Sequence, residues 1–102
     1  MRRGTTPTIV FHLPFNVSEI KNCEVYFSQN DELVVSKSMD DCDLSDTYLA
    51  VTLTQAETLA LSDEEKCEVQ VRFVYQDGTV DATTILKDKV ERILKDGEIN
   101  VE

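Results

Sequence analysis

The fold is decided by one stretch, residues 52–78, which reads TLTQAETLALSDEEKCEVQVRFVYQDG. From Cys67 to Tyr75 every odd position is apolar and, apart from Val74, the even positions are polar. An alternation with a period of two residues predicts a β-strand with one buried face. Asp77–Gly78 tolerates the positive φ angles of a tight turn, so we expect a hairpin whose returning strand begins near Thr79.

The first part of this stretch predicts a short helical crossover. Thr54 is followed three residues later by Glu57, the arrangement of a capping box, and Ala56, Leu59 and Ala60 can share one side of a helical turn or two. We therefore expect an α-helix or 3₁₀ helix here, followed by a solvated connection into the long strand.

Four other runs alternate or are rich in β-branched residues, which favours strands. They are Thr8–Leu13, Cys23–Gln29, Glu32–Ser38 and Thr47–Leu53. Pro14 ends the first run and suits a strand near the edge of a sheet, because proline cannot continue the ladder. An acidic loop over residues 40–46 is expected between the third and fourth runs.

The end of the chain leaves two alternatives open. Residues 86–94 fit a helix, whereas the run from Val80 fits a strand, and we favour a strand that continues to about Arg92 because the hairpin needs a returning arm. Residues 95–102 are expected to form an extended tail after a turn at Asp96–Gly97, and residues 1–6 a flexible polar arm.

Six or seven short strands spaced about ten residues apart, with one short helical crossover, predict a mostly β fold. The expected architecture is a single antiparallel immunoglobulin-like β-sandwich that forms one domain over residues 1–102.

The net charge of −10 is concentrated in the middle of the chain. Residues 31–68 hold eleven acidic residues and two lysines. Such a field repels phosphate, which argues against nucleic acid or anionic lipid as a partner and favours a basic surface or a cation. A solvated acidic face that maintains solubility is the simpler interpretation.

The three cysteines, Cys23, Cys42 and Cys67, contain no CxxC pair, so reduced thiols are expected. Cys23 and Cys67 both occupy inward positions, and an inter-sheet bridge between them remains an alternative. The sequence contains neither a recognisable signal peptide nor an apolar run long enough to span a membrane.

The weak candidate for a metal site is the acidic loop, since calcium takes oxygen ligands from loops of this kind. Its four carboxylates are Asp40, Asp41, Asp43 and Asp46, but their spacing is not that of an EF-hand. His12, the only histidine, is expected to be partly buried and bonded to backbone groups. We predict no catalytic residues, no cofactor and no enzyme activity.

Strand edges are the remaining candidate sites. Thr8–Leu13 and Glu98–Glu102 are candidates for pairing with another chain, because an open edge offers unpaired N–H and C=O groups. The alternative, to which we give equal weight, is that the proline, the charges and the short length of these segments protect the edges from pairing.

Three stretches carry a resemblance to a known family. They are TTPTIVFHLPFNVSEI, TLTQAETLAL and VQVRFVYQDGTV. Together they resemble small tail and baseplate proteins of phages and prophages of Gram-positive bacteria, and in particular the N-terminal immunoglobulin-like domain of baseplate upper proteins. The pattern marks core and turn positions, so it transfers no functional residues.

The resemblance implies a non-catalytic structural or assembly protein of a phage tail or baseplate. It would be made in the bacterial cytoplasm and incorporated in a virion or phage-like particle, in contact with itself as a homo-oligomer or with neighbouring tail proteins. The alternative is an acidic regulatory or inhibitory module that binds a basic partner surface.

Overall fold

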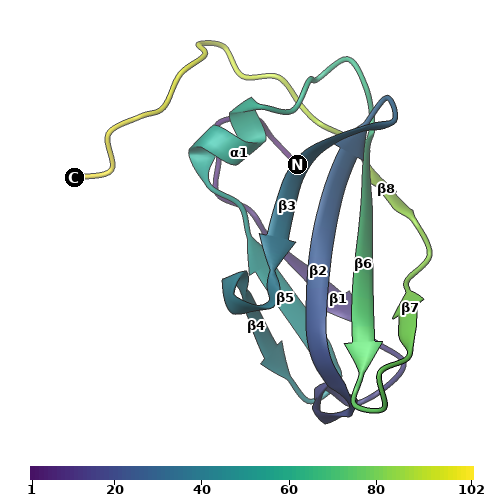
Figure 1. Ribbon diagram of the computed structural model, residues 1–102. Helices are drawn as coiled ribbons and strands as arrows, with labels where there is room; N and C mark the ends of the chain where they lie inside the picture. Colours follow the sequence, from purple (N-terminus) through teal and green to yellow (C-terminus); the bar gives the residue numbers. More distant parts are fainter.

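The computed structural model describes all residues, 1–102, as a mostly β fold with two antiparallel sheets packed face to face (Figure 1). One short α-helix, α1 (Gln55–Leu59), and two 3₁₀ turns, η1 (Val17–Glu19) and η2 (Met39–Asp41), connect the strands. The strands are β1 (Thr8–His12), β2 (Ile20–Gln29), β3 (Glu32–Ser38), β4 (Cys42–Ser45), β5 (Tyr48–Thr52), β6 (Cys67–Tyr75), β7 (Val80–Ala82) and β8 (Leu86–Asp88). The expected mostly β sandwich class is confirmed.

The larger sheet is built on the ladder between β2 and β6. Its order is β3-β2-β6-β7, and β8 also pairs with β6. Inward residues face each other across the ladder, with Val25 opposite Val71 and Phe27 opposite Val69. The bounds of β6 are those expected from the alternation, and its inward residues are buried as predicted.

The smaller sheet has the order β1-β5-β4, so β1 lies at an edge as expected. Its strand β4 was not expected, because residues 40–46 were interpreted as an acidic loop. Instead η2 turns the chain, β4 pairs with β5, and Asp46 takes a positive φ of 51° in the tight connection. The inward residues Cys42 and Leu44 pack against the core, which gives this acidic segment its strand.

The core lies between the two sheets and comprises sixteen buried apolar residues. Phe11, Leu49 and Val51 come from the smaller sheet, and Phe27 and Phe73 from the larger. Burial of each large apolar side chain contributes about 1.5–3 kcal/mol, so this set is the main favourable contribution to folding. The structure contains no helix with the length and apolar character that a membrane crossing needs.

The crossover forms as the sequence predicts. The Thr54 hydroxyl accepts a hydrogen bond from the Glu57 amide at 3.1 Å, and the Glu57 carboxylate accepts one from the Thr54 amide at 2.8 Å. Glu57 also pairs with the nearly buried Lys37 at 2.7 Å. Burial alone would raise the pKa of Glu57, but the hydrogen bonds from Lys37 and Thr54 outweigh it and lower the pKa.

The expectation of one strand from Val80 to about Arg92 was wrong, because two short strands, β7 and β8, share this segment along the same edge of β6. Thr83 interrupts them. Its hydroxyl accepts a hydrogen bond from the Val71 amide at 3.1 Å, and its carbonyl accepts one from the Gln70 side chain at 2.9 Å. Residues 86–94 therefore contain a three-residue strand and no helix.

Residues 1–6, which we predicted to be a flexible arm, make several contacts with the rest of the chain. The Arg3 guanidinium donates to the carbonyls of Leu59 and Leu61 at 2.9 and 2.8 Å and pairs with Asp96 at 2.6 Å. The Arg3 amide donates to the Glu91 carbonyl at 3.0 Å. Arg3 thus holds the arm by satisfying carbonyls at the end of α1, and Met1 adds an apolar contact with the core.

A buried polar side chain fixes the connection between α1 and β6. The Gln29 amide nitrogen donates to the carbonyls of Ser62 and Glu65 at 2.7 and 2.9 Å, and its oxygen accepts from the Ser62 amide at 2.7 Å. Gln29 closes the otherwise irregular 62–65 segment onto β2.

We predict that Gln29→Ala lowers the free energy of unfolding by about 1–3 kcal/mol, because three backbone groups lose their partner. Gln55→Ala is the matched control, since that side chain bonds only the exposed tail at Ile99. It should cost less than about 0.5 kcal/mol. Urea denaturation measures both, and equal losses would contradict the role of Gln29.

Candidate functional site

The outer face of the smaller sheet is nearly free of charge. Eight side chains alternate outward on its three strands, namely Thr8, Val10 and His12 on β1, Tyr48, Ala50 and Thr52 on β5, and Asp43 and Ser45 on β4. Asp43 is the only acidic or basic residue among them, in a chain with 29% charged residues. We call this surface the neutral face.

Side chains on the neutral face are paired across the strands. The His12 and Tyr48 rings stack with centroids 4.9 Å apart and an interplanar angle of 34°, and the hydroxyls of Thr8 and Thr52 lie 2.7 Å apart. Val10 and Tyr48 are each half or more exposed. The result is an ordered surface of mostly uncharged polar side chains, with Val10, Ala50 and the Tyr48 ring as its apolar part.

The expectation for His12 was wrong, because this residue is exposed and makes no hydrogen bond to the backbone. The sequence correctly predicted that His12 and Val10 lie on the same side of the strand, but that side faces outward. No carboxylate or thiol is hydrogen-bonded to its ring, so the geometry of an acid-base pair is not present at His12.

The outer face of the larger sheet contrasts with the neutral face. It carries Glu24, Glu68, Arg72 and Lys87, together with the outward Tyr26, whose hydroxyl donates to Glu24 at 2.9 Å. Burial and the hydrogen bond to Glu24 raise the pKa of Tyr26. This face has the charged, solvated character that the composition leads one to expect for the whole surface.

The four carboxylates of the candidate metal loop do not converge. Asp41 turns back to accept hydrogen bonds from the Ser38 amide and hydroxyl at 2.9 and 3.1 Å, which lower its pKa. Asp43 points outward from β4, and Asp46 lies in the tight turn beyond it. No three His, Cys, Asp or Glu side chains in the structure form a group with the geometry of a metal site.

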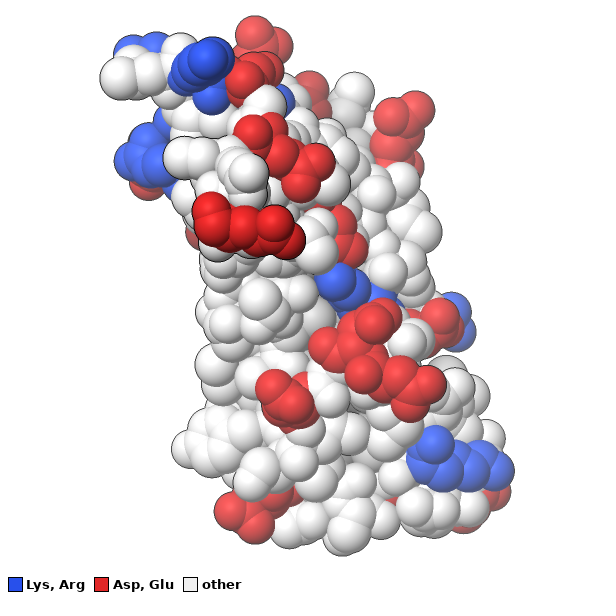
Figure 2. All heavy atoms as spheres, turned by 90° about the vertical axis from the view of Figure 1, so that its left-hand side faces the viewer, with Lys and Arg blue, Asp and Glu red and all other residues white.

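Acidic side chains are instead distributed over the surface. In Figure 2, which shows the side of the molecule that carries α1, β4 and β5, acidic groups are scattered from top to bottom. A broad uncharged area remains toward the lower left of this view. On this face the acidic groups are dispersed, and a largely uncharged area lies among them.

The bridge considered between Cys23 and Cys67 is excluded by the register. Cys23 lies opposite Phe73 on β6, six positions from Cys67, so the two thiols are separated by about 20 Å along one sheet. All three cysteines are free. The neighbour of the Cys23 thiol is Cys42, on the opposite sheet.

The thiols are poor nucleophiles. Burial raises the pKa of Cys23 and of Cys67 to about 11, and burial also raises the pKa of Cys42. Since the thiolate is the reactive form, very little of it is present at neutral pH.

We predict that iodoacetamide labels the native protein at pH 8 at least about tenfold more slowly at Cys23 and Cys67 than an unfolded chain, because thiols with a pKa of about 11 are mostly protonated there. All three cysteines should react rapidly in urea. Mass spectrometry of labelled peptides measures the rates, and a fast native Cys23 or Cys67 would contradict the burial.

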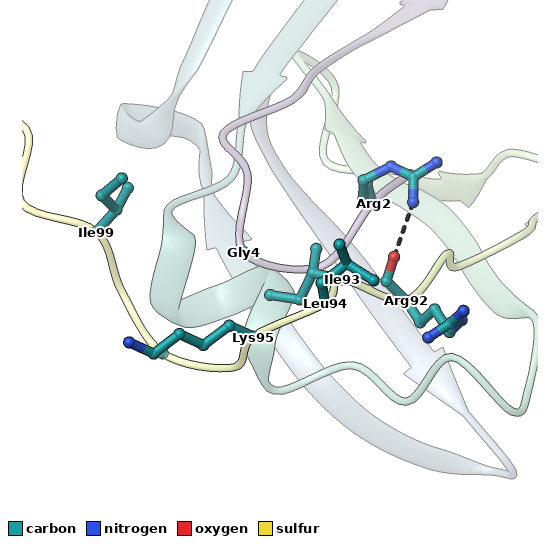
Figure 3. Close-up of a pocket in the computed structure, with 8 residues that line it drawn as sticks. Arg2, Gly4, Arg92, Ile93, Leu94, Lys95 and Ile99 are labelled. Carbon is teal, nitrogen blue, oxygen red and sulfur yellow. Dashed lines mark hydrogen bonds between the residues drawn. The ribbon is translucent and has the colours of Figure 1, made fainter.

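A hollow of about 490 Å³ lies between the N-terminal arm and the tail. Arg2, Arg92 and Lys95 line it, but they do not converge on one point (Figure 3). The Arg2 guanidinium donates to the Arg92 carbonyl at 2.7 Å and pairs with Glu91, while the Arg92 and Lys95 side chains point in opposite directions. The hollow therefore lacks the convergent donors of an anion site.

The hollow does explain Gly4. This residue has a φ of +72°, and a Cβ atom there would lie 2.9 Å from the Ile93 side chain. The positive φ favours glycine at this position, and a larger residue would also displace the end of the Ile93 side chain.

Comparison with known proteins adds no assignment. No family model matches the chain, and no significant match is found among curated proteins or solved structures.

Proposed function

We propose that this protein is a non-catalytic structural or assembly protein that acts through protein–protein contacts made by the neutral face. The observation that carries the proposal is the near absence of charge over eight outward residues of one sheet, in a chain with a net charge of −10. Charged residues are depleted at the centres of protein interfaces, and aromatic residues are enriched.

The geometry of the neutral face supports this role. Tyr48 is held by the His12 ring, so burying it against a partner costs little side-chain entropy. Val10 lies two pairs along the same two strands, opposite Ala50 and on the same face, and adds to the apolar part of the surface. A rigid and flat sheet face of this kind fits a complementary flat surface better than it fits a small molecule.

The setting we propose is the tail or baseplate of a phage or prophage. The support is the sequence resemblance over residues 5–20, 52–61 and 69–80. The protein would then be synthesised in the bacterial cytoplasm and incorporated in a virion or phage-like particle. Its partners would be other copies of itself or neighbouring tail and baseplate proteins.

A second candidate function is an acidic module that occupies a basic partner surface. It is favoured by one observation: Asp40, Asp41 and Asp43 are all exposed and lie close together in sequence where η2 leads into β4. Charge complementarity with a basic surface would then steer binding and make it sensitive to salt.

We predict that the double variant Val10→Lys/Tyr48→Glu weakens partner binding or self-association at least about tenfold, because it places charge at the centre of the interface. The matched control is Val80→Lys, an exposed valine on the other sheet. It should leave binding unchanged. Light scattering after size exclusion and pull-down against the products of adjacent genes provide the measurement.

Charge reversal at Asp40, Asp41 and Asp43 separates the two candidates. An assembly protein should keep its partner, whereas an acidic module should lose it. A chain that stays strictly monomeric and captures no neighbouring gene product would contradict the assembly role.

A further inference from the structure

The larger sheet is one strand wider than the sheet that covers it. β7 pairs with Arg72–Val74 of β6 and β8 pairs with Cys67–Val69, while β2 occupies the other side of β6. The two short strands therefore form a fourth column beyond β6. The smaller sheet is only three strands wide, so one of the four strand positions of the larger sheet lacks a strand behind it.

The uncovered column is the one formed by β7 and β8. Figure 1 shows β1 behind β2 and β6, with β7 and β8 beyond it on the outer side. Phe15, just after β1, packs on Phe73 and Tyr75 of β6 with ring centroids 4.8 and 5.5 Å apart, which agrees with that placement. We call the inner side of β7 and β8, next to the open edge of β1, the recess.

Leu86 shows that the recess is open. It lies directly opposite Val69, and residues paired across an antiparallel ladder point to the same face. Val69 is 3% exposed under the smaller sheet, whereas Leu86 is 50% exposed. Leu86 therefore faces the inner side of the sheet and is still half exposed. Asp81 and Asp88 face the same side, because they lie opposite the buried Phe73 and Cys67, and the Asp88 carboxylate pairs there with the Met1 amino group at 3.2 Å.

The wall of the recess formed by β1 is an unprotected edge. Edge strands are usually protected from pairing by charged residues. The other open edges follow that rule, since β3 carries Glu32 and Lys37 and β4 carries Asp43. The sequence of β1, TIVFH, contains no acidic residue, lysine or arginine.

Direct pairing of two β1 edges is sterically opposed. Each copy carries β7 and β8 beyond its own β1, so strands placed about 4.8 Å apart would force these two columns into the same space. A single extended segment fits the recess, whereas a second sandwich does not.

Residues 98–102 have the features of such a segment. They read EINVE, with Ile99 and Val101 in one phase and polar residues in the other, and their length equals that of β1. Ile99 is 74% and Val101 83% exposed, so the chain buries neither. The tail extends on the side of α1, away from β7 and β8 (Figure 1).

We propose that residues 98–102 of one copy add as a fourth strand to the β1 edge of a second copy, with Ile99 and Val101 covering Leu86 in the recess. The proposal deepens the assembly function and names its partner as a second copy of this chain. The two hydrogen bonds that Gln55 makes to the Ile99 backbone are exchanged for those of the β1 ladder.

The interface is heterologous, because each copy donates its tail and accepts another. Repetition closes into a ring or continues as an open chain. Both chains are acidic, so about 0.3 M salt should be present to screen their mutual repulsion.

The test uses one variant defective as donor and one defective as acceptor. The donor variant is Ile99→Ser/Val101→Ser, with Asn100→Ser as its control in the opposite phase. The acceptor variant is Leu86→Glu, with Lys87→Glu as its control on the opposite face of β8. Leu86 is half exposed, and thermal unfolding should confirm that Leu86→Glu remains folded.

Light scattering should show oligomers for the natural chain and both controls, and single chains for each defective variant alone. An equal mixture of the two defective variants should form a dimer, because one copy still has its recess and the other still has its tail. A labelled peptide of residues 95–102 should bind the donor variant and not Leu86→Glu.

A mixture that stays monomeric, or oligomers that persist in Leu86→Glu, would overturn the proposal. Leu86→Glu leaves the neutral face intact, so capture of a neighbouring gene product by this variant would show that the assembly function holds even when strand addition fails.

Discussion

The structure depends on the ladder between β2 and β6, which sets the different widths of the two sheets. β6 presents alternate apolar residues to the core along its whole length, and β2 fixes their register. Because β6 also pairs with β7 and β8, the larger sheet extends beyond the smaller one. The neutral face and the recess are both properties of the smaller sheet, one of its outer surface and the other of its edge.

These two features give the chain two different ways to make contacts. The neutral face offers side chains, with Tyr48 and Val10 at its centre, and suits a flat partner surface. The β1 edge offers backbone groups and suits an extended segment. In an assembly protein the first contact would join the chain to a neighbour and the second would join copies to one another. The dispersed acidic surface would limit contacts elsewhere.

Regular alternation was the part of the fold that sequence could predict. The bounds of β3 and β6 and the cap at Thr54 follow from local patterns that the structure retains. The short strand β4 was missed because its two inward residues lie among aspartates that indicate a loop. The contacts of Arg3 and the interruption at Thr83 were missed because each depends on partners that only the tertiary structure brings near. The candidate edge at β1 was predicted, but the recess beside it requires knowledge of both sheets.

Hydrogen exchange at two protein concentrations tests most directly whether the recess beside β1 takes a strand from another copy. In dilute solution, amides of residues 98–102 and the outward amides of β1 should exchange rapidly, because their only partners within the chain are the exposed side chains of Gln55 and Asn100. In concentrated solution both sets should become protected together, while the amides of β3 at the opposite edge should not change. Exchange that is independent of concentration at β1 and at residues 98–102 would contradict strand addition.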